Sequence, residues 1–478
     1  MIASTPSSVL DTLPRFMTNV TDAELDTIRS LVATWRAKQP RNLLRSVYYD
    51  GKMPLKPTGN IPAEAFRRIK AVLGWPEKAV GGLADRTVFD GFVSPGQQQD
   101  PFGLSEMLDL NRFDLDLPQA IVSAFKHSCS FITIARGDTQ GGEPPVLIMP
   151  RSAEWSAGLW DKRRRAVKGA LAVTAVDDGG NPKAMDVYLP GLVLLCTRRP
   201  SGSWVAERRD AKLQEVLVEP LAYDPQLDRP FGRSRISRAV MSITDHALTT
   251  IVRTEIGGDF YAVPRMAAIG VAEDAFKRGK WQAAIDRMLA ITRDEEGELP
   301  SLHQFAQMTM QPLMDQYRMY ASQFSGETGL PVSSLGIVQD NPPSAEALYA
   351  AEKDLIVKAR ATTKVLGGSL RQVARKVVMV RDGLTEAPAE LRGIQTNWLN
   401  PAFTSPVTAA DALVKLSTVF PWLGDTEDAL RYAGFTEAEV TRLLSDKRRA
   451  QGGSTLARAL AARSAATDTT AAPGDDAA

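Results

Sequence analysis

The sequence predicts a mainly helical α+β chain that contains one block of antiparallel β structure. Apolar residues recur at helical spacing over residues 1–130 and again from 234 to 449. Residues 131–222 instead divide into short apolar runs that have the length of strands. Sequences rich in Gly, Asp, Asn and Pro separate these runs, which is the pattern expected of hairpin turns.

Length, charge and cysteine content exclude several classes of protein. The chain has 478 residues, enough for about three domains of ~150 residues each. Its 57 Lys and Arg nearly balance its 56 Asp and Glu, which argues against binding nucleic acid or membranes through bulk charge. Cys129 and Cys196 form no Cys-x-x-Cys motif, so neither a disulfide scaffold nor a thiolate zinc site is expected. No apolar run reaches the ~18 residues of a membrane span, and the N-terminus has no secretory-signal pattern.

The first 130 residues are expected to form helices. Thr21 followed by Glu24 is a capping-box pattern that predicts a helix start, and apolar residues continue at helical spacing as far as Trp35. A second helix is expected from residue 61 until it closes at 74–76, and a third over 117–125.

The block at 131–222 is expected to form an antiparallel meander of about seven strands. Between two of these strands lies the basic run KRRR at 162–165. This run could bind phosphate or form the solvated turn of a hairpin, and the residues alone favour the turn.

The C-terminal half is expected to alternate long helices with turn-rich breaks. Ser344 is expected to be the N-cap of a helix reaching about residue 380, in which Gly367 and Gly368 predict a kink or a break. The other expected elements are a helix from 234 to about 260, a helix at 272–289, a helix at 308–324, helices over 408–449 and a disordered tail over 451–478.

The sequence contains no recognisable catalytic constellation. The three histidines, His127, His246 and His303, are isolated and lack metalloprotease spacing. No phosphate-binding loop, nucleophile elbow or dinucleotide fingerprint occurs. We therefore expect no catalytic residue, no metal site and no cofactor.

Three segments and the order of the elements resemble the portal proteins (head–tail connectors) of tailed double-stranded DNA bacteriophages, of the siphophage type. The first segment is LRSVYYDG at 44–51, continued by LGWP at 73–76 and VFDGF at 88–92. The second is PFGRSRIS at 230–237, and the third is GLPVSSLG at 329–336, followed by NPPSAEAL at 341–348. The likeness covers roughly residues 40–450, and this family has no catalytic residues.

The resemblance implies the portal fold, assembled as a ring that is expected to be a dodecamer. In this fold the β meander belongs to the part called the wing. The implied parts are wing 1–230, stem helix 231–261, clip 262–307, stem helix 308–328, tunnel-loop region 329–344, long wing helix 345–404, crown 405–450 and tail 451–478.

The resemblance also implies a function and a set of partners. The ring would be the channel at one capsid vertex, through which phage DNA is packaged and later ejected. Expected partners are the passing double-stranded DNA, the terminase large subunit, the major capsid and scaffolding proteins and a head–tail adaptor, with no membrane. The protein would be found in the virion, and in the host cytoplasm during assembly. Alternatives are another phage minor capsid or adaptor protein, or a phage DNA-processing enzyme.

Two groups of residues are candidates for the channel and its surroundings. The expected tunnel loop holds Ile337, Val338, Gln339, Asp340 and Asn341, without any Lys or Arg, which suits a conduit better than a clamp. The second group is a candidate basic surface within residues 356–381, which contain no Asp or Glu. Its members are Lys358, Arg360, Lys364, Arg371, Arg375 and Lys376. They could surround DNA, pair with acids of a neighbouring subunit, or form a solvated helix face, and the sequence leaves these readings open.

Overall fold

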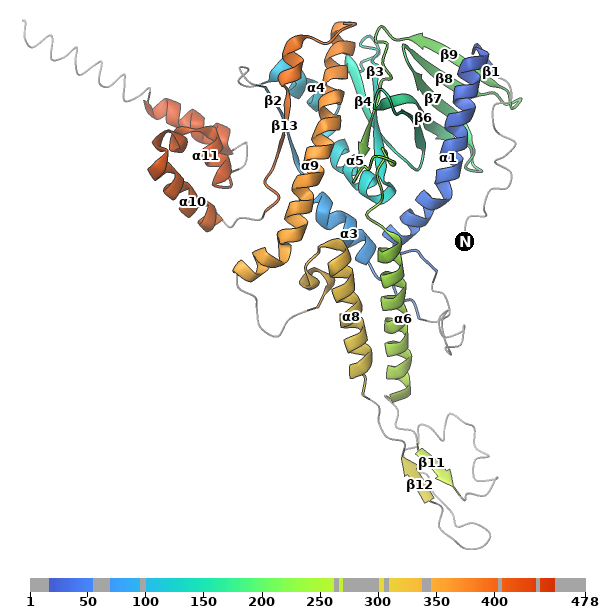
Figure 1. Ribbon diagram of the computed structural model, residues 1–478, viewed down its shortest axis with the longest axis vertical. Helices are drawn as coiled ribbons and strands as arrows, with labels where there is room; N and C mark the ends of the chain where they lie inside the picture. Colours follow the sequence, from blue (N-terminus) through green and yellow to red (C-terminus); the bar gives the residue numbers. More distant parts are fainter. Residues whose placement is uncertain are drawn as a thin grey trace, which may run out of the picture. The chain divides into compact units, whose positions relative to one another are not determined.

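The structure is a computed structural model in two compact units, Met1–Pro401 and Ala402–Ala478, each described here by itself (Figure 1). The residues that it describes are 17–54, 69–94, 100–261, 266–269, 301–304, 309–337, 345–402, 406–435 and 439–451. Within these residues no helix is long and apolar enough to cross a membrane.

The β block forms two sheets rather than the single meander that the sequence predicts. The smaller sheet has the order β10-β3-β4, with β3 at Cys129–Arg136, β4 at Val146–Ser152 and β10 at Val218–Ala222. The larger sheet has the order β1-β9-β8-β7-β6-β5 and is antiparallel except for the β1–β9 pair. Its strands are β1 Met17–Thr18, β5 Ser156–Asp161, β6 Ala166–Val176, β7 Pro182–Leu189, β8 Leu192–Arg198 and β9 Trp204–Asp210.

The split into two sheets follows from the burial of β3. Six consecutive residues of this strand are buried, which is the pattern of a central strand that is covered on both faces. Strand β3 also pairs along both edges, with β4 and with β10, and so lies at the centre of the smaller sheet. Helices α5, Phe113–His127, and α9, Ala345–Asp382, both pack on this sheet.

The basic run at 162–165 forms the turn of the β5–β6 hairpin, as the sequence favours. The carboxylate of Asp161 accepts hydrogen bonds from the backbone N–H groups of Arg163, at 2.8 Å, and Arg164, at 3.0 Å. All four basic side chains are exposed.

Helix α1, Asp22–Tyr49, covers the larger sheet. Its capping box is confirmed: Thr21 N donates to Glu24 Oε2 at 2.8 Å, and Glu24 N donates to Thr21 Oγ1 at 3.4 Å. Ile28, Leu31 and Trp35 are buried in the cluster that also holds the inner face of β6–β9. Local capping and apolar spacing thus place this helix as the sequence predicts.

The prediction of a second helix is wrong for the part of it that the structure describes. Residues 69–74 are not helical, and 55–68 lie outside the described residues. Gly74 and Pro76 begin helix α3, Trp75–Ala84, instead of ending a helix. Proline suits the first turn because its missing N–H has no helical partner there. The third predicted helix is confirmed and longer, as α5 at Phe113–His127, and the short η2 Pro101–Gly103 and α4 Leu104–Leu110 precede it.

Helix α9, Ala345–Asp382, is a single continuous helix. The kink predicted at Gly367 and Gly368 is absent. An added Cβ at Gly367 would lie 2.4 Å from Thr396 Oγ1, so this glycine allows strand β13, Gln395–Trp398, to approach the helix closely. Strand β13 pairs with β2, Phe89–Val93, and the short η5 Ala389–Gly393 precedes it.

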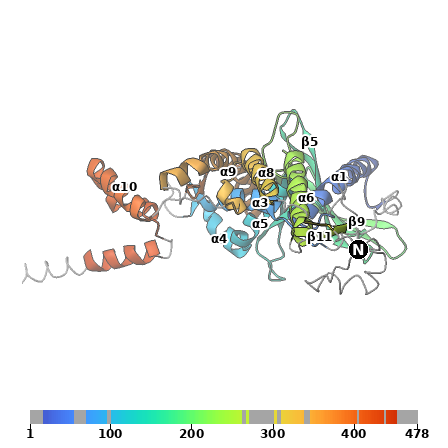
Figure 2. The ribbon, with the colours of Figure 1, turned by 90° about the horizontal axis from the view of Figure 1, so that it is seen from below.

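Helices α6, Arg238–Tyr261, and α8, Gln311–Thr328, pack side by side (Figure 1). Between them in sequence, β11 Met266–Ile269 and β12 Ser301–Gln304 form an antiparallel ribbon. The helix expected at 272–289 lies outside the described residues. Viewed from below, α6 and α8 lie between α1 on one side and α4 and α9 on the other (Figure 2).

The second unit is helical, as predicted for 408–449. It contains α10 Pro406–Val419, η6 Pro421–Asp425, α11 Glu427–Tyr432 and a helical stretch at 439–451. Thr426 Oγ1 caps α11 by accepting from Ala429 N at 3.2 Å. The expected tail falls almost wholly outside the described residues.

Candidate functional site

Parts of the three sequence segments singled out above, 44–51 with 73–76, 230–237 and 329–336, meet where α6 and α8 join the rest of their unit. We call this junction the helix-pair root and define it by Tyr48, Trp75, Arg235, Asp245 and Thr328. It draws on α1, α3, the segment before α6, α6 itself and the end of α8.

The segment 230–237 forms the entry to α6. Gly232 has φ +70°, and an added Cβ would lie 2.0 Å from Tyr223 O, so only glycine fits this turn. Ser234 Oγ donates to Lys126 O at 2.5 Å, which fixes the segment to the end of α5. Ser237 Oγ accepts from Val240 N at 3.1 Å and caps the helix.

Arg235 joins three elements at the root. Its side chain is buried and donates to Ala79 O of α3, to Thr328 O at 2.6 Å and to Tyr223 OH at 3.3 Å. The five donors of a planar guanidinium can serve several acceptors in fixed directions. A single cation therefore holds α3, the C-terminal end of α8 and the segment after β10 in one arrangement.

Two aromatic residues connect the root to the N-terminal helices. Tyr48 OH donates to both carboxylate oxygens of Asp245 on α6, at 3.0 and 2.9 Å. Burial, followed by the Asp245 hydrogen bond and charge, raises the pKa of Tyr48 well above its usual range, so the hydroxyl keeps its proton. The ring of Trp75 lies 5.3 Å from that of Tyr317 and 5.1 Å from that of Phe324, between centroids, and so packs α3 on α8.

The segment 329–336 closes α8 against α3. Gly329 ends the helix in the left-handed region, at φ +72°, and its N–H donates to Ser325 O at 2.7 Å. Leu330 is buried against Gly82, where an added Cβ would lie 2.6 Å from Leu330 Cδ2. Lys78 Nζ donates to Ser334 O at 2.6 Å. These contacts explain why this run is rich in turn residues.

One tunnel-loop candidate can be placed. Ile337 is half-buried and packs against the core of its own chain. With Gly336 it also borders a cavity of about 520 Å³ between α6 and α8, which Ile251 and Tyr317 line as well. Val338, Gln339, Asp340 and Asn341 lie outside the described residues.

Three of the six residues in the candidate basic surface pair with acidic residues of the same chain. Lys376 is buried, 2.7 Å from Glu219 Oε1, and its Nζ donates to Val216 O at 2.6 Å. Arg375 pairs with Glu215. Lys358 lies 3.6 Å from Asp224 and 5.5 Å from the centroid of the Tyr223 ring.

These acids were missed because they lie more than a hundred positions away in sequence, on and around β10, and reach α9 only through tertiary packing. The burial of Lys376 could have been predicted from its spacing from Val373 and Val380, since this spacing places the lysine on the apolar face of the helix.

The other three basic residues stay exposed. Arg371 donates to Gln395 Oε1 at 2.9 Å. Within the described part of the chain, the side chains of Arg360 and Lys364 have no acidic partner. They are the members of the predicted surface that remain available to an outside partner.

The side chains of two of the three histidines can be placed. His127 is buried, and its ring contacts Ser46 Oγ at 2.9 Å and Ser152 Oγ at 3.2 Å. Burial above all, and then the Lys126 and Arg45 charges, lower the pKa of His127 to about 3, so it is neutral beside Glu154. His246 stacks on Tyr320 with centroids 5.6 Å apart, and nothing is described for the His303 side chain. Across the described ranges, no three His, Cys, Asp or Glu side chains gather as a metal site.

Comparison with known proteins gives the family. The sequence model of phage portal proteins of the SPP1 Gp6-like type matches residues 29–452. The portal protein of Mycobacterium phage L5 is 26% identical over 382 residues, covering 77% of each chain, and that of Mycobacterium phage D29 is 26% identical over 404 residues, covering 82% of each. A solved chain from the neck of an empty GTA particle aligns with TM-score 0.43 and 13% identity over 84% of this chain and 98% of its own. The chain therefore belongs to the SPP1 Gp6-like family of phage portal proteins.

Proposed function

We propose that twelve copies of this chain form a ring whose central channel is lined by α6 and α8. As a portal protein the chain is a structural, non-enzymatic component of the portal vertex of the virion and works as a ring of identical subunits. The number twelve, the lining of the channel and the partners named below are our proposal.

The observation that carries the proposal is the incomplete burial of α8 within one chain. The buried residues of this helix begin only at Ala321, and Met314 and Met319 are 47% and 46% exposed. A long helix with exposed methionines on its outer half needs a further surface to cover it. A neighbouring α6–α8 pair in a ring supplies that surface.

The order of the elements supports an assignment of parts. The two sheets with α1, α3, α5 and α9 correspond to the wing, and α6 and α8 to the stem. The β11–β12 ribbon lies between the stem helices in sequence and belongs to the clip, and the helices after residue 405 form the crown. The helix-pair root is then the joint between wing and stem, which explains why Arg235 and Tyr48 fix it from several directions.

We assign partners by part. The clip receives the terminase large subunit during packaging and the head–tail adaptor afterwards, while the wing meets the major capsid and scaffolding proteins. The loop at 337–344 projects into the channel toward the DNA. Arg360, Lys364 and Arg371 face either DNA or a neighbouring subunit, because they are the members of the candidate basic surface that stay exposed.

Native mass spectrometry of the purified full chain tests the ring. We expect a closed ring of twelve, whereas monomers or dimers alone across micromolar concentrations would contradict the proposal. The motor-free protein should show no ATP turnover, because the sequence has no phosphate-binding loop with its lysine.

Deleting residues 338–341 tests the tunnel loop. The variant should still assemble but should package or retain DNA poorly. A matched deletion in the exposed β6–β7 turn, residues 178–180, is the control. A loop-deleted ring that packages and retains DNA normally would overturn the assignment.

A further inference from the structure

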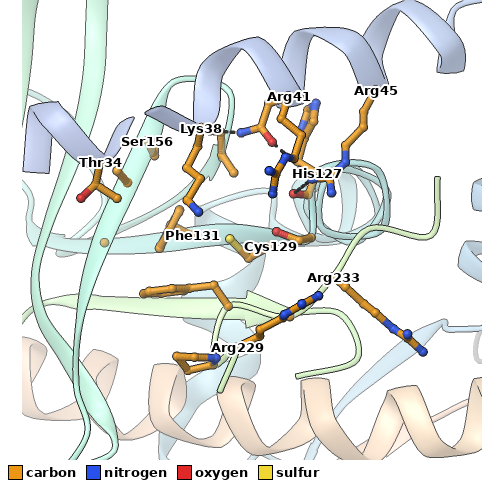
Figure 3. A pocket seen from close by; sticks show the side chains of 18 of the residues that line it. Thr34, Lys38, Arg41, Arg45, His127, Cys129, Phe131, Ser156, Arg229 and Arg233 are labelled. Atoms are coloured by element: carbon orange, nitrogen blue, oxygen red, sulfur yellow. Dashed lines mark hydrogen bonds between the residues drawn. The ribbon is translucent and has the colours of Figure 1, made fainter. Parts of the chain in front are cut away.

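A basic cavity of about 420 Å³ lies beside α1 and is lined by no residue of α6 or α8. It is bordered by α1, the end of α5, the start of β3, β5 and the segment at 228–233 (Figure 3). Its size falls in the range of small-molecule sites in proteins, about 300–1,000 Å³.

One wall of the cavity is cationic and comes from a single face of α1. Lys38, Arg41 and Arg45 follow one another at spacings of three and four residues, which aligns their side chains. Figure 3 shows Lys38 and Arg41 extending from α1 toward the side where Cys129 and Phe131 lie. Lys38 and Arg41 are exposed at the mouth, and among the described residues neither forms an ion pair.

Arg45 lies deeper and is only partly satisfied. Its Nη1 donates to His127 O at 2.8 Å, but its Nε is buried without a hydrogen-bond partner in the described chain. Burial, followed by the nearby Arg41 charge, lowers the pKa of Arg45 to about 10. A buried, under-bonded guanidinium beside a second arginine favours the arrival of an anion.

The remaining charges of the lining largely cancel one another. Arg233 Nε lies 2.5 Å from Asp224 Oδ2, and Arg229 lies 3.5 Å from Asp228, the acidic residue of the lining. The α1 cations are the ones left without compensation. The excess positive charge is therefore localised on one wall instead of being spread around the cavity.

Away from the α1 wall, the cavity is lined by one buried hydroxyl, that of Ser156, and by the aromatic rings of Phe131 and Phe231. Ser156 is 5% exposed, and its Oγ is buried without a partner among the described residues. The rings of Phe131 and Phe231 lie 5.8 Å apart, and an added Cβ at Gly158 would lie 3.1 Å from each. Glycine at this position therefore lets the two rings pack closely against β5, with Phe131 only 3% exposed.

We propose that this cavity binds a phosphate-bearing small molecule of nucleotide size, with its phosphate on Lys38, Arg41 and Arg45 and its ring against Phe131 and Phe231. Arginine forks match the oxygens of phosphate, and the unpartnered Ser156 hydroxyl supplies a further donor. A flat aromatic group fits beside phenylalanine rings at little desolvation cost. The sequence contains no hydrolytic motif, so the role is binding without turnover.

Isothermal titration of the purified full chain with deoxyadenosine monophosphate tests the site, alongside deoxyadenosine, inorganic phosphate and a 20-base-pair duplex. We expect the monophosphate to saturate one site per chain, to bind more tightly than either of its parts, and not to be displaced by the duplex. Lys38→Gln with Arg41→Gln should weaken monophosphate binding at least tenfold. The matched control, Lys162→Gln with Arg163→Gln, removes the same charge from the β5–β6 turn and should change the affinity less than twofold.

A second readout locates the ligand independently of affinity. The monophosphate should protect Lys38 from acetylation and leave Lys162 reactive. The proposal is overturned if millimolar monophosphate does not bind, if both double variants lose binding equally, if only the duplex binds, or if Lys38 is not protected. The size of the ring, measured separately for each variant, distinguishes failure of this site from failure of assembly. If the parent chain binds no nucleotide and the Lys38 and Arg41 changes disrupt the ring, the basic wall is a contact between subunits instead.

Discussion

Lys376 of α9 and Glu219 of β10 form an ion pair inside the fold, with Nζ 2.7 Å from Oε1 and side chains that are 5% and 17% exposed. The lysine also donates to two carbonyl groups around β10, Val216 O at 2.6 Å and Val218 O at 3.2 Å. This lysine thus has its three donors satisfied where the long helix crosses the small sheet.

Breaking this pair should destabilise the chain strongly. In Lys376→Met the Glu219 carboxylate stays largely buried without its counter-ion, so we expect the free energy of unfolding to fall by about 3 kcal/mol. Adding Glu219→Gln should restore part of the loss, because it removes the unpaired charge. Urea denaturation measures both. Arg360→Met, at an exposed site on the same helix, is the control and should change stability by less than about 0.5 kcal/mol; an equal loss in this control would refute the account.

His127 should make the fold sensitive to acid. Its pKa is about 3 when folded and about 6.5 when unfolded, so between these values the unfolded chain binds a proton that the native chain does not. Stability should therefore fall as pH drops from about 6.5 toward 3, by at most about 1.4 kcal/mol per pH unit from this group.

Replacing this histidine isolates its contribution. His127→Gln should make the loss of stability below pH 6.5 shallower, measured by urea denaturation at a series of pH values. His246→Gln, at an exposed position, is the matched control for a histidine replacement. Identical slopes in the parent chain and His127→Gln would contradict the prediction.

Arg235 should be needed for the joint between α6, α8 and α3. Lysine at this position keeps the charge but cannot reach the Ala79 and Thr328 carbonyls together, so Arg235→Lys should cost about 3 kcal/mol through buried acceptors left unpaired. Native mass spectrometry should also show fewer closed rings. Arg238→Lys, at the exposed start of α6, serves as the control, and equal behaviour of the two variants would refute the role.

Two adjacent glycines of α9 should respond oppositely to alanine. At Gly367 the new Cβ meets Thr396 Oγ1 at 2.4 Å, so Gly367→Ala should lower the free energy of unfolding by about 1–3 kcal/mol. At Gly368 an added Cβ has no contact within 4 Å, so Gly368→Ala should raise it by about 0.5–1 kcal/mol through helix propensity. Thermal unfolding of both variants gives the sign, and destabilisation by both would show that the helix is not continuous here.

The sequence alone pointed to much of the helix-pair root, but it did not show which contacts hold the root together. The runs at 230–237 and 329–336 stood out because glycine, proline and serine clusters mark turns and helix ends. That Arg235 and Leu330 both contact the same helix, α3, could be found only from the structure, because a run of residues shows only its local turn.

The sequence by itself determined what depends on neighbours along the chain: the capping box of Thr21 and Glu24, the helical and strand-like blocks, and the hairpin turn at 162–165. Only the tertiary structure decided which side chains meet across long separations. It buried Lys376 against Glu219, turned Gly367 from an expected kink into a point of close packing, and split the β block by giving β3 two partners. The physical reason is that capping and periodicity are set by residues three or four positions apart, whereas pairing, burial and close approach are set by packing among residues 10 to 157 positions apart in these cases.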